Sequence, residues 1–181
     1  VPSGPGYLTE PNLRMFNSIV HNAKEQLTLC SPYFVPEESL LEAITSACYR
    51  GVRVDLFVGE KADQFMVHHA QSAYYEVLLE AGVRIWEFPA PYVLHTKFVL
   101  ADPGREGAVG VLGSSNMDIR SFSLNYESSL LVASGALLPA LEQLGANYQA
   151  VSRELTLERW ARRPWYRRYV DNVMKLTSAL Q

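Results

Sequence analysis

The feature of this sequence that most restricts its fold is an alternation between two periodicities. Short, largely apolar runs of the length of buried strands alternate with longer segments in which apolar residues recur at helical spacing. An order in which helices connect successive strands is typical of a parallel sheet, and therefore predicts an α/β fold. The expected helices cover 10–25, 36–51 and 63–82, and the expected strands cover 27–30, 52–58 and 83–88.

Strands in close succession dominate the next part of the chain. Residues 93–101, 109–112 and 124–132 have strand character, and Asp102-Pro103-Gly104 has the composition of a hairpin turn between the first two. A helical pattern follows at 137–151. Together with the first half, this order predicts a mixed β-sheet with helices on both faces.

We expect a single domain over residues 1–181. A hydrophobic content of 48% is enough for a core, and a charged content of 19% argues against disorder. Residues 1–8 contain proline and glycine and are predicted to be a linker. Residues 157–181 are predicted to be a basic, aromatic, helical tail that is broken near Pro164.

Charge and composition restrict the possible partners. Residues 1–150 contain 9 Lys/Arg and 16 Asp/Glu, whereas residues 151–181 contain 7 and 3. An acidic body is a poor electrostatic partner for nucleic acid, so the charge distribution argues against nucleic acid as a ligand. No window approaches the ~18 apolar residues that cross a bilayer. The 2 cysteines are too few for a disulfide scaffold, and we expect buried thiols.

The strongest chemical signal lies between Leu94 and Asp102. His95 and Lys97 are two apart on a predicted strand, so their side chains are expected on one face. Burying this pair is costly without an anion, and a phosphate would supply it. The lysine offers a charged donor, and the imidazole offers a nucleophile or acid near neutrality. Strict alternation puts Asp102 on the opposite face, which favours a structural role near the strand end.

A second polar group follows in Gly113-Ser114-Ser115-Asn116. If the strand continues, Ser114 and Asn116 share a face, where a hydroxyl and an amide can donate to the same phosphate oxygens. Glu127, within the next apolar strand, could hold an imidazole by its second nitrogen and fix its tautomer. Each signal alone has an ordinary explanation, namely a surface His–Lys pair, a turn and a solvent-facing carboxylate.

In combination, these residues resemble a known signature. The sequence contains HxKxxxxD, from His95 to Asp102, followed by GSxN, from Gly113 to Asn116. In this order the two patterns resemble the signature of the phospholipase D superfamily. A phospholipase D-like fold is therefore implied. Four further stretches are similar to the second half of bacterial cardiolipin synthases: Pro2-Ser3-Gly4-Pro5, Ser31-Pro32-Tyr33-Phe34-Val35-Pro36, Leu79-Glu80-Ala81-Gly82-Val83-Arg84-Ile85 and Asn116-Met117-Asp118-Ile119-Arg120-Ser121-Phe122.

The resemblance implies a phosphatidyl transfer that needs no metal and no cofactor. One histidine attacks the phosphodiester and forms a phosphohistidine, and a second histidine protonates the leaving alcohol. Phosphatidylglycerol or a related phospholipid is the implied substrate, and cardiolipin the product. The role of His95 stays open; because the upstream histidine is often the nucleophile in two-motif relatives, we favour the acid. The implied catalytic residues are His95, Lys97 and Asp102, the phosphate-binding residues are Ser114 and Asn116, and Glu127 orients the histidine.

The number of motifs departs from the family, which builds each active site from two HxKxxxxD motifs. This sequence has one, because His21, His68 and His69 lack a lysine two residues on. We expect the second motif to come from an upstream half or from another subunit. The chain begins at Val1. We therefore expect a soluble piece of a longer protein that is anchored in the inner membrane and faces the cytoplasm.

The C-terminal tail is a second candidate for function. Residues 159–169 contain five arginines and four aromatic residues, a composition that suits a lipid headgroup interface at roughly 1 kcal/mol per basic residue. The alternative is a helix whose aromatic residues pack on the domain while its arginines lie in water. The candidate membrane contacts are Trp160, Arg162, Arg163, Trp165, Arg167 and Arg168.

Two other functions remain open from the sequence. One is a phosphodiesterase or nuclease in which two identical single-motif chains build one site by symmetry. The other is an inactive module that binds a membrane or a partner protein. The acidic body argues against the nuclease, and the intact motif residues argue against the inactive module.

Overall fold

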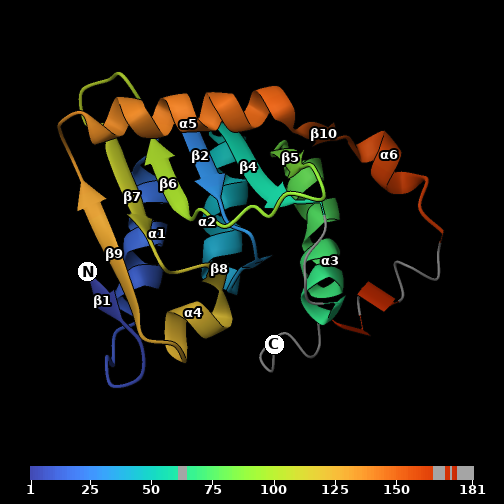
Figure 1. The fold of residues 1–181 in the computed structure, drawn as a ribbon, viewed down its shortest axis with the longest axis horizontal. Coiled ribbons are helices and arrows are strands. Elements are labelled where there is room, and N and C mark those ends of the chain that lie inside the picture. The colour runs from blue at the N-terminus through green and yellow to red at the C-terminus, as the bar shows by residue number, and fades with distance from the viewer. Residues whose placement is uncertain (61–64, 165–169, 172, 175–181) are drawn as a thin grey trace.

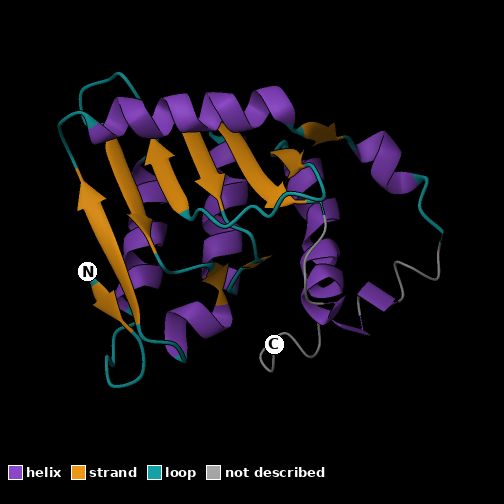
Figure 2. Cartoon of the chain, viewed as in Figure 1, coloured by secondary structure: helices purple, strands orange, loops and turns teal. Residues whose placement is uncertain are grey.

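The computed structural model describes residues 1–60, 65–164, 170–171 and 173–174. Within them, eight strands form one mixed sheet, and helices cover both of its faces (Figures 1 and 2). The predicted α/β class with helices on both faces is therefore confirmed. The helices are α1 (Pro11–Asn22), α2 (Glu38–Tyr49), α3 (Phe65–Ala81), α4 (Ile119–Ser123), α5 (Leu137–Val151) and α6 (Leu157–Ala161).

The sheet has a parallel centre and antiparallel flanks. Strands β2, β4 and β5 are parallel, and the other neighbouring pairs are antiparallel. A separate parallel pair joins β3 (Phe34–Val35) to β8 (Met117–Asp118). In spatial order the large sheet consists of β1 (Pro2–Ser3), β9 (Glu127–Val132), β7 (Val109–Gly113), β6 (Phe98–Ala101), β2 (Gln26–Cys30), β4 (Arg53–Gly59), β5 (Arg84–Phe88) and β10 (Arg153–Leu155).

Each face of the sheet has its own apolar layer, because successive strand residues point to opposite faces. In β4, Leu56 and Val58 belong to the layer shared with α1, α2 and α3, whereas Phe57 belongs to the layer under α5. Leu141 of α5 packs in the second layer and is 3% exposed. Burial of each large side chain stabilises the fold by roughly 1.5–3 kcal/mol.

The strand directions bring several chain segments to one edge of the sheet. Cys30, the last residue of β2, pairs with Phe98, the first of β6, and Phe98 pairs with Leu112 near the end of β7. Gly113 in turn pairs with Ser129 near the start of β9. The segments before β6, after β7 and before β9 therefore emerge together. We call this side of the sheet the catalytic edge, because the residues that the sequence predicts to be catalytic lie in these segments.

Two boundaries differ from those expected from the sequence. The strand expected at 93–101 begins only at Phe98, because its partner β2 ends opposite that residue and the chain turns away through Pro32. The expected linker at 1–8 is in part a strand, since β1 pairs with β9 and Ser3 is buried. The amino group of Val1 also donates to the Ser129 carbonyl at 2.6 Å.

Within the described residues, the C-terminal helix is shorter than the helix expected from the sequence. Helix α6 begins at Leu157, capped by the Thr156 side chain, and ends at Ala161. Pro164 disfavours helical geometry in the residue before it, which accounts for the early end. The rest of the expected helix lies partly outside the described residues.

Candidate active site

The segment that carries His95 is held by contacts on both sides of that residue. Leu94 is 3% exposed and packs in the apolar layer under α5. The Thr96 hydroxyl bonds the Tyr148 hydroxyl of α5 at 2.8 Å, and the Thr96 carbonyl accepts from the Cys30 thiol at 3.3 Å. His95 itself is exposed, and its imidazole makes no hydrogen bond to a described residue. The ring is thus presented on a fixed backbone.

Lys97 is buried directly behind His95, with 8% of its surface exposed. Its Nζ donates to the His95 carbonyl at 2.6 Å, and its own carbonyl accepts from the Gly113 amide at 3.3 Å. Burial lowers the pKa of Lys97, and the negative charges of Glu127 and Asp118 offset part of this effect. The lysine therefore lies in the electrostatic field of both carboxylates.

Ser114 and Glu127 meet where β7 ends and β9 begins. The Ser114 amide donates to the Ser128 carbonyl at 3.1 Å, and the Ser128 amide donates to the Ser114 hydroxyl at 3.0 Å. That hydroxyl donates in turn to the Glu127 carboxylate. The expected contact between Glu127 and the His95 imidazole is not formed among the described residues, and Ser114 is the partner of this carboxylate instead.

Asp118 is a member of the site that the sequence reasoning missed. It caps α4, accepting from the Ser121 amide at 2.7 Å, and it also accepts from the Asn116 side chain. Burial raises the pKa of Asp118, and the charge of Glu127 adds to the increase. The Asn116 Oδ1 is buried and has no hydrogen-bond partner among the described residues. Aspartate is a preferred N-cap residue, so the sequence could have indicated a helix cap here, although it could not indicate the place of Asp118 in the site.

Ser31 fixes the position of this polar loop against the sheet. Its hydroxyl accepts from the Met117 amide at 3.0 Å, and Met117 and Asp118 pair with Phe34 and Val35. The residue after β2 therefore sets the place of Asn116 and Asp118. This connection explains why two segments that are far apart in the sequence lie side by side at the catalytic edge.

Asp102 lies at the opposite end of β6, where its contacts are those of a residue that stabilises the fold. Its carboxylate accepts from the backbone amides of Lys24, Glu25 and Gln26 at 2.9, 2.8 and 3.0 Å. Burial alone would raise the pKa of Asp102, but the three backbone donors outweigh it, so the pKa lies below its usual value. This geometry favours the structural role that strand alternation predicts for Asp102, and its catalytic role stays a prediction that the family motif implies.

Two of the six candidate membrane contacts are directed inward. Trp160 is 9% exposed and packs on Tyr75 with ring centroids 5.1 Å apart. The Arg163 guanidinium lies 3.4 Å from the Trp160 ring centre and is paired with Asp171. These contacts favour the packing alternative for Trp160 and Arg163, and their assignment as membrane contacts stays a prediction. Arg162 is exposed, and Trp165, Arg167 and Arg168 lie outside the described residues.

The searches for a membrane span and a metal cluster concern the described residues only. None of the helices there has the length and hydropathy needed to cross a bilayer. In the same part of the chain, no three His, Cys, Asp or Glu side chains form a group that could hold a metal ion.

The chemistry available at the catalytic edge suits a phosphoryl group. An exposed imidazole can act as a nucleophile or acid, and a buried lysine and nearby hydroxyl and amide groups can donate to phosphoryl oxygens. These groups reach one edge from three chain segments: His95 and Lys97 before β6, Ser114 and Asn116 after β7, and Glu127 at the start of β9.

Comparison with known proteins gives clear similarities. Residues 17–148 match the family model described as cardiolipin synthase, PLD-like domain. A protein named cardiolipin synthase A from Serratia proteamaculans is 37% identical over 180 residues, which are 99% of this chain and 36% of the relative. The protein of the same name from Proteus mirabilis is 34% identical over the same shares. The chain thus spans 36% of the length of these relatives.

Solved structures support the fold. A phosphatidylserine synthase from Haemophilus influenzae superposes with a TM-score of 0.72 at 19% identity, over 99% of this chain and 47% of that one. Nuc, a phospholipase D family member from Salmonella typhimurium, gives a TM-score of 0.67 at 17% identity, over 79% of this chain and 90% of that one. At these identities the likeness concerns the fold alone.

Proposed function

Since the chain belongs to the family described as cardiolipin synthase, PLD-like domain, we propose that it supplies one half of a phosphatidyltransferase active site that makes cardiolipin from phosphatidylglycerol. The observation that carries the proposal is the gathering of His95, Lys97, Ser114 and Asn116 at one sheet edge. The names of the most similar relatives support the choice of lipid substrates.

The reaction has two displacements at phosphorus. A histidine nitrogen attacks the phosphodiester of one phosphatidylglycerol, and the bond to its terminal glycerol breaks. The second histidine gives that glycerol a proton. The hydroxyl of another phosphatidylglycerol then attacks the phosphohistidine and loses its proton to the second histidine, so cardiolipin and glycerol are the products. We assign His95 as the acid, and Lys97 and Ser114 as donors to the phosphoryl oxygens.

The charges at the edge support a second motif. Lys97 is the lysine that the described part of the chain places at this edge, and it interacts with two acidic side chains, Glu127 and Asp118, so the edge lacks the excess of positive charge that suits a phosphodiester anion. A second HxKxxxxD motif would add a lysine and the second histidine. We propose that it comes from an upstream half or from another subunit, as the family pattern implies.

The substrate places the reaction at a membrane surface. Phosphatidylglycerol is a bilayer lipid, so we propose that the complete protein works at the cytoplasmic face of the inner membrane and contacts anionic lipid. Arg162, which is exposed just after α6, is the remaining described candidate for this contact. The attraction of such a residue to an anionic leaflet is roughly 1 kcal/mol.

The test uses the active enzyme with both motifs present. His95→Ala should abolish cardiolipin formation from radiolabelled phosphatidylglycerol, and Lys97→Ala should reduce it by roughly 100-fold or more because a charged donor to the phosphoryl group is lost. If His95 is the acid, a nitrophenyl phosphodiester should still give a burst of nitrophenol in His95→Ala, because its leaving group needs little protonation.

Three outcomes would count against the proposal. Full cardiolipin synthesis by His95→Ala would remove this motif from the reaction. Loss of the nitrophenol burst, with the fold intact by circular dichroism, would make His95 the nucleophile. Release of phosphatidic acid without cardiolipin would favour the phosphodiesterase instead.

A further inference from the structure

A polar cavity lies between α3, β5, β10 and α6. Its volume is about 370 Å³, and it shares no lining residue with the group around His95 and Lys97. We call it the β10 pocket. Its polar lining includes Glu60, Ser72, Glu87, Arg153 and Arg159. A cavity of this size can hold a small polar molecule.

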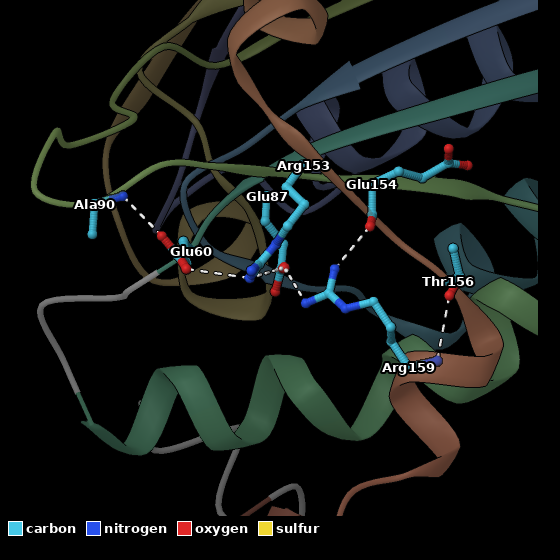
Figure 3. Close-up of polar contacts among 7 residues, drawn as sticks. All are labelled: Glu60, Glu87, Ala90, Arg153, Glu154, Thr156 and Arg159. Atoms are coloured by element: carbon cyan, nitrogen blue, oxygen red, sulfur yellow. Dashed lines mark hydrogen bonds and ion pairs between the residues drawn. The ribbon is translucent and has the colours of Figure 1, made fainter.

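The guanidinium groups of Arg153 and Arg159 belong to the lining of this pocket, and both contact Glu87 (Figure 3). Arg153 donates to Glu60 at 3.3 Å and to Glu87 at 3.1 Å. Arg159 donates to the Glu154 carbonyl at 3.0 Å, and its other terminal nitrogen lies 3.7 Å from Glu87. A guanidinium has five N–H donors, so both groups keep donors that these contacts do not use. Their side chains are 60% and 41% exposed, and therefore remain accessible.

Ser72 provides a third donor inside the pocket. It is 5% exposed and lines the cavity, and its hydroxyl makes no hydrogen bond to any residue of the described part of the chain. That hydroxyl is therefore available to donate to a molecule in the cavity. One helical turn earlier on α3, His69 also lines the pocket and bonds Asp171 at 2.6 Å.

We propose that the β10 pocket binds the phosphate group of a small phosphate ester. Arginine forks match the geometry of phosphate oxygens, and the Ser72 hydroxyl can donate to a third oxygen. Glu60 and Glu87 hold the two arginines in place before the ligand arrives, and they can accept from hydroxyls of the alcohol part. The ester comes either from a lipid headgroup or from a soluble molecule of the glycerol phosphate class.

The pocket is linked to the catalytic edge through Glu60. The other carboxylate oxygen of Glu60 accepts from the Ala90 amide at 3.0 Å, at the start of the segment that leads to His95 (Figure 3). Only β2 separates β4, which Glu60 follows, from β6, so the two strands lie about 10 Å apart. The proposed site is nevertheless separate from the phosphatidyltransferase chemistry, and does not depend on it.

The test is a titration of the ¹⁵N-labelled chain followed by amide chemical shifts. The probes are inorganic phosphate, sn-glycerol 3-phosphate and monomeric dihexanoyl phosphatidylglycerol. We expect saturable shifts at Ser72, Arg153 and Arg159. Arg159→Gln should weaken binding roughly tenfold, through loss of a charge-assisted hydrogen bond. Ser72→Ala should weaken it less, and Arg159→Lys should fail to restore it because the fork is missing.

Two control variants locate the binding. Arg105→Gln should leave the affinity unchanged, since Arg105 is similarly exposed and pairs with Glu25 away from the pocket. Lys97→Ala should leave the β10 pocket shifts unchanged even where it abolishes transfer activity. The relative affinities of the three probes then show whether the bound ester comes from a lipid or from a soluble molecule. A lipid headgroup site prefers the phosphatidylglycerol, and a soluble-ester site prefers the glycerol phosphate.

Three results would overturn the proposal. The first is the absence of saturable shifts with every probe. The second is a set of shifts confined to His95, Lys97 and Ser114, which would mean that phosphate binds at the catalytic edge alone. The third is an equal loss of affinity in Arg105→Gln and Arg159→Gln, which would indicate general charge screening.

Discussion

Lys97 and Asp102 belong to the same short motif but have opposite environments at the two ends of β6. Lys97 is buried at the catalytic edge, where desolvation lowers its pKa. Asp102 lies at the far end, and its three backbone donors lower its pKa in spite of burial. The motif therefore combines a group that we propose to face the phosphoryl group with one that fixes the end of the strand.

Replacing Asp102 with asparagine should reduce stability without touching the catalytic edge. Asparagine tolerates the positive φ of 49° at this position but lacks the charge that strengthens three backbone hydrogen bonds. We expect the free energy of unfolding to fall by roughly 2–4 kcal/mol at pH 7. Urea denaturation followed by circular dichroism measures it.

The same replacement gives a pH signature. Because the folded pKa of Asp102 lies below 3.8, its stabilisation is complete above pH 3.8 and is lost as the pH falls through the folded value. The difference between the two proteins should therefore shrink at acid pH. Glu106→Gln, which replaces an exposed carboxylate in the same turn, is the matched control. It should change neither the free energy of unfolding at pH 7 nor the dependence of that free energy on pH. A stability difference that is independent of pH would contradict this account of Asp102.

Much of the residue-level site could be anticipated from the sequence, but the pairing of side chains could not. The HxKxxxxD and GSxN spacings identify His95 and Lys97, and Ser114 and Asn116, because short motifs record local chemistry. The partner of Glu127 depends on the register of β7 and β9, which places Ser114 beside it. The place of Asp118 in the site could not be predicted, because it depends on the contact of Met117 with Ser31.

At the level of elements, the β7–β9 pairing depends on a close approach at Gly113. A Cβ atom on Gly113 would lie 2.8 Å from the Cα of Ser129, and it would also crowd the Ser128 carbonyl. These are backbone atoms that cannot move independently of β9. The glycine therefore allows the two strands to bring Ser114 against Glu127.

Gly113→Ala should separate these strands. We expect it to lower the free energy of unfolding by about 1–3 kcal/mol, as overpacking does in a well-packed region. Gly145→Ala is the matched control: Gly145 lies inside α5, and the nearest atom to its added Cβ, Thr28 Cγ2, is at an ordinary 3.5 Å. That control should be neutral or stabilising by about 0.5–1 kcal/mol. Equal stability of the two variants in urea denaturation would show that the close approach at Gly113 is not needed.

The elements that the sequence predicts well are those with strong local signals. The helix expected at 137–151 is present with the same limits, and the hairpin around Asp102 is present because its turn residues favour positive φ. Strands β3, β8 and β10 were missed because they have two or three residues each and exist through contacts with distant segments. The late start of β6 likewise depends on where β2 ends.

At the level of the whole molecule, the sheet places the candidate reactive groups on one edge. At that edge the acidic side chains outnumber the lysine. Lys97 interacts electrostatically with Glu127 and Asp118, and His95 is exposed at the surface. Such an edge fits one half of a site that is completed by a second lysine and histidine. We therefore predict that the chain folds by itself and depends on a second HxKxxxxD motif for its chemistry.

The measurement that tests this claim most directly is phosphatidyl transfer by the isolated chain, before and after a second HxKxxxxD half is added. With radiolabelled phosphatidylglycerol in vesicles, we expect almost no cardiolipin from the chain alone at any concentration, and synthesis that rises and saturates as the second half is titrated in. A His95→Ala chain should fail to support that synthesis. Strong cardiolipin formation by the chain as a proven monomer would contradict the account.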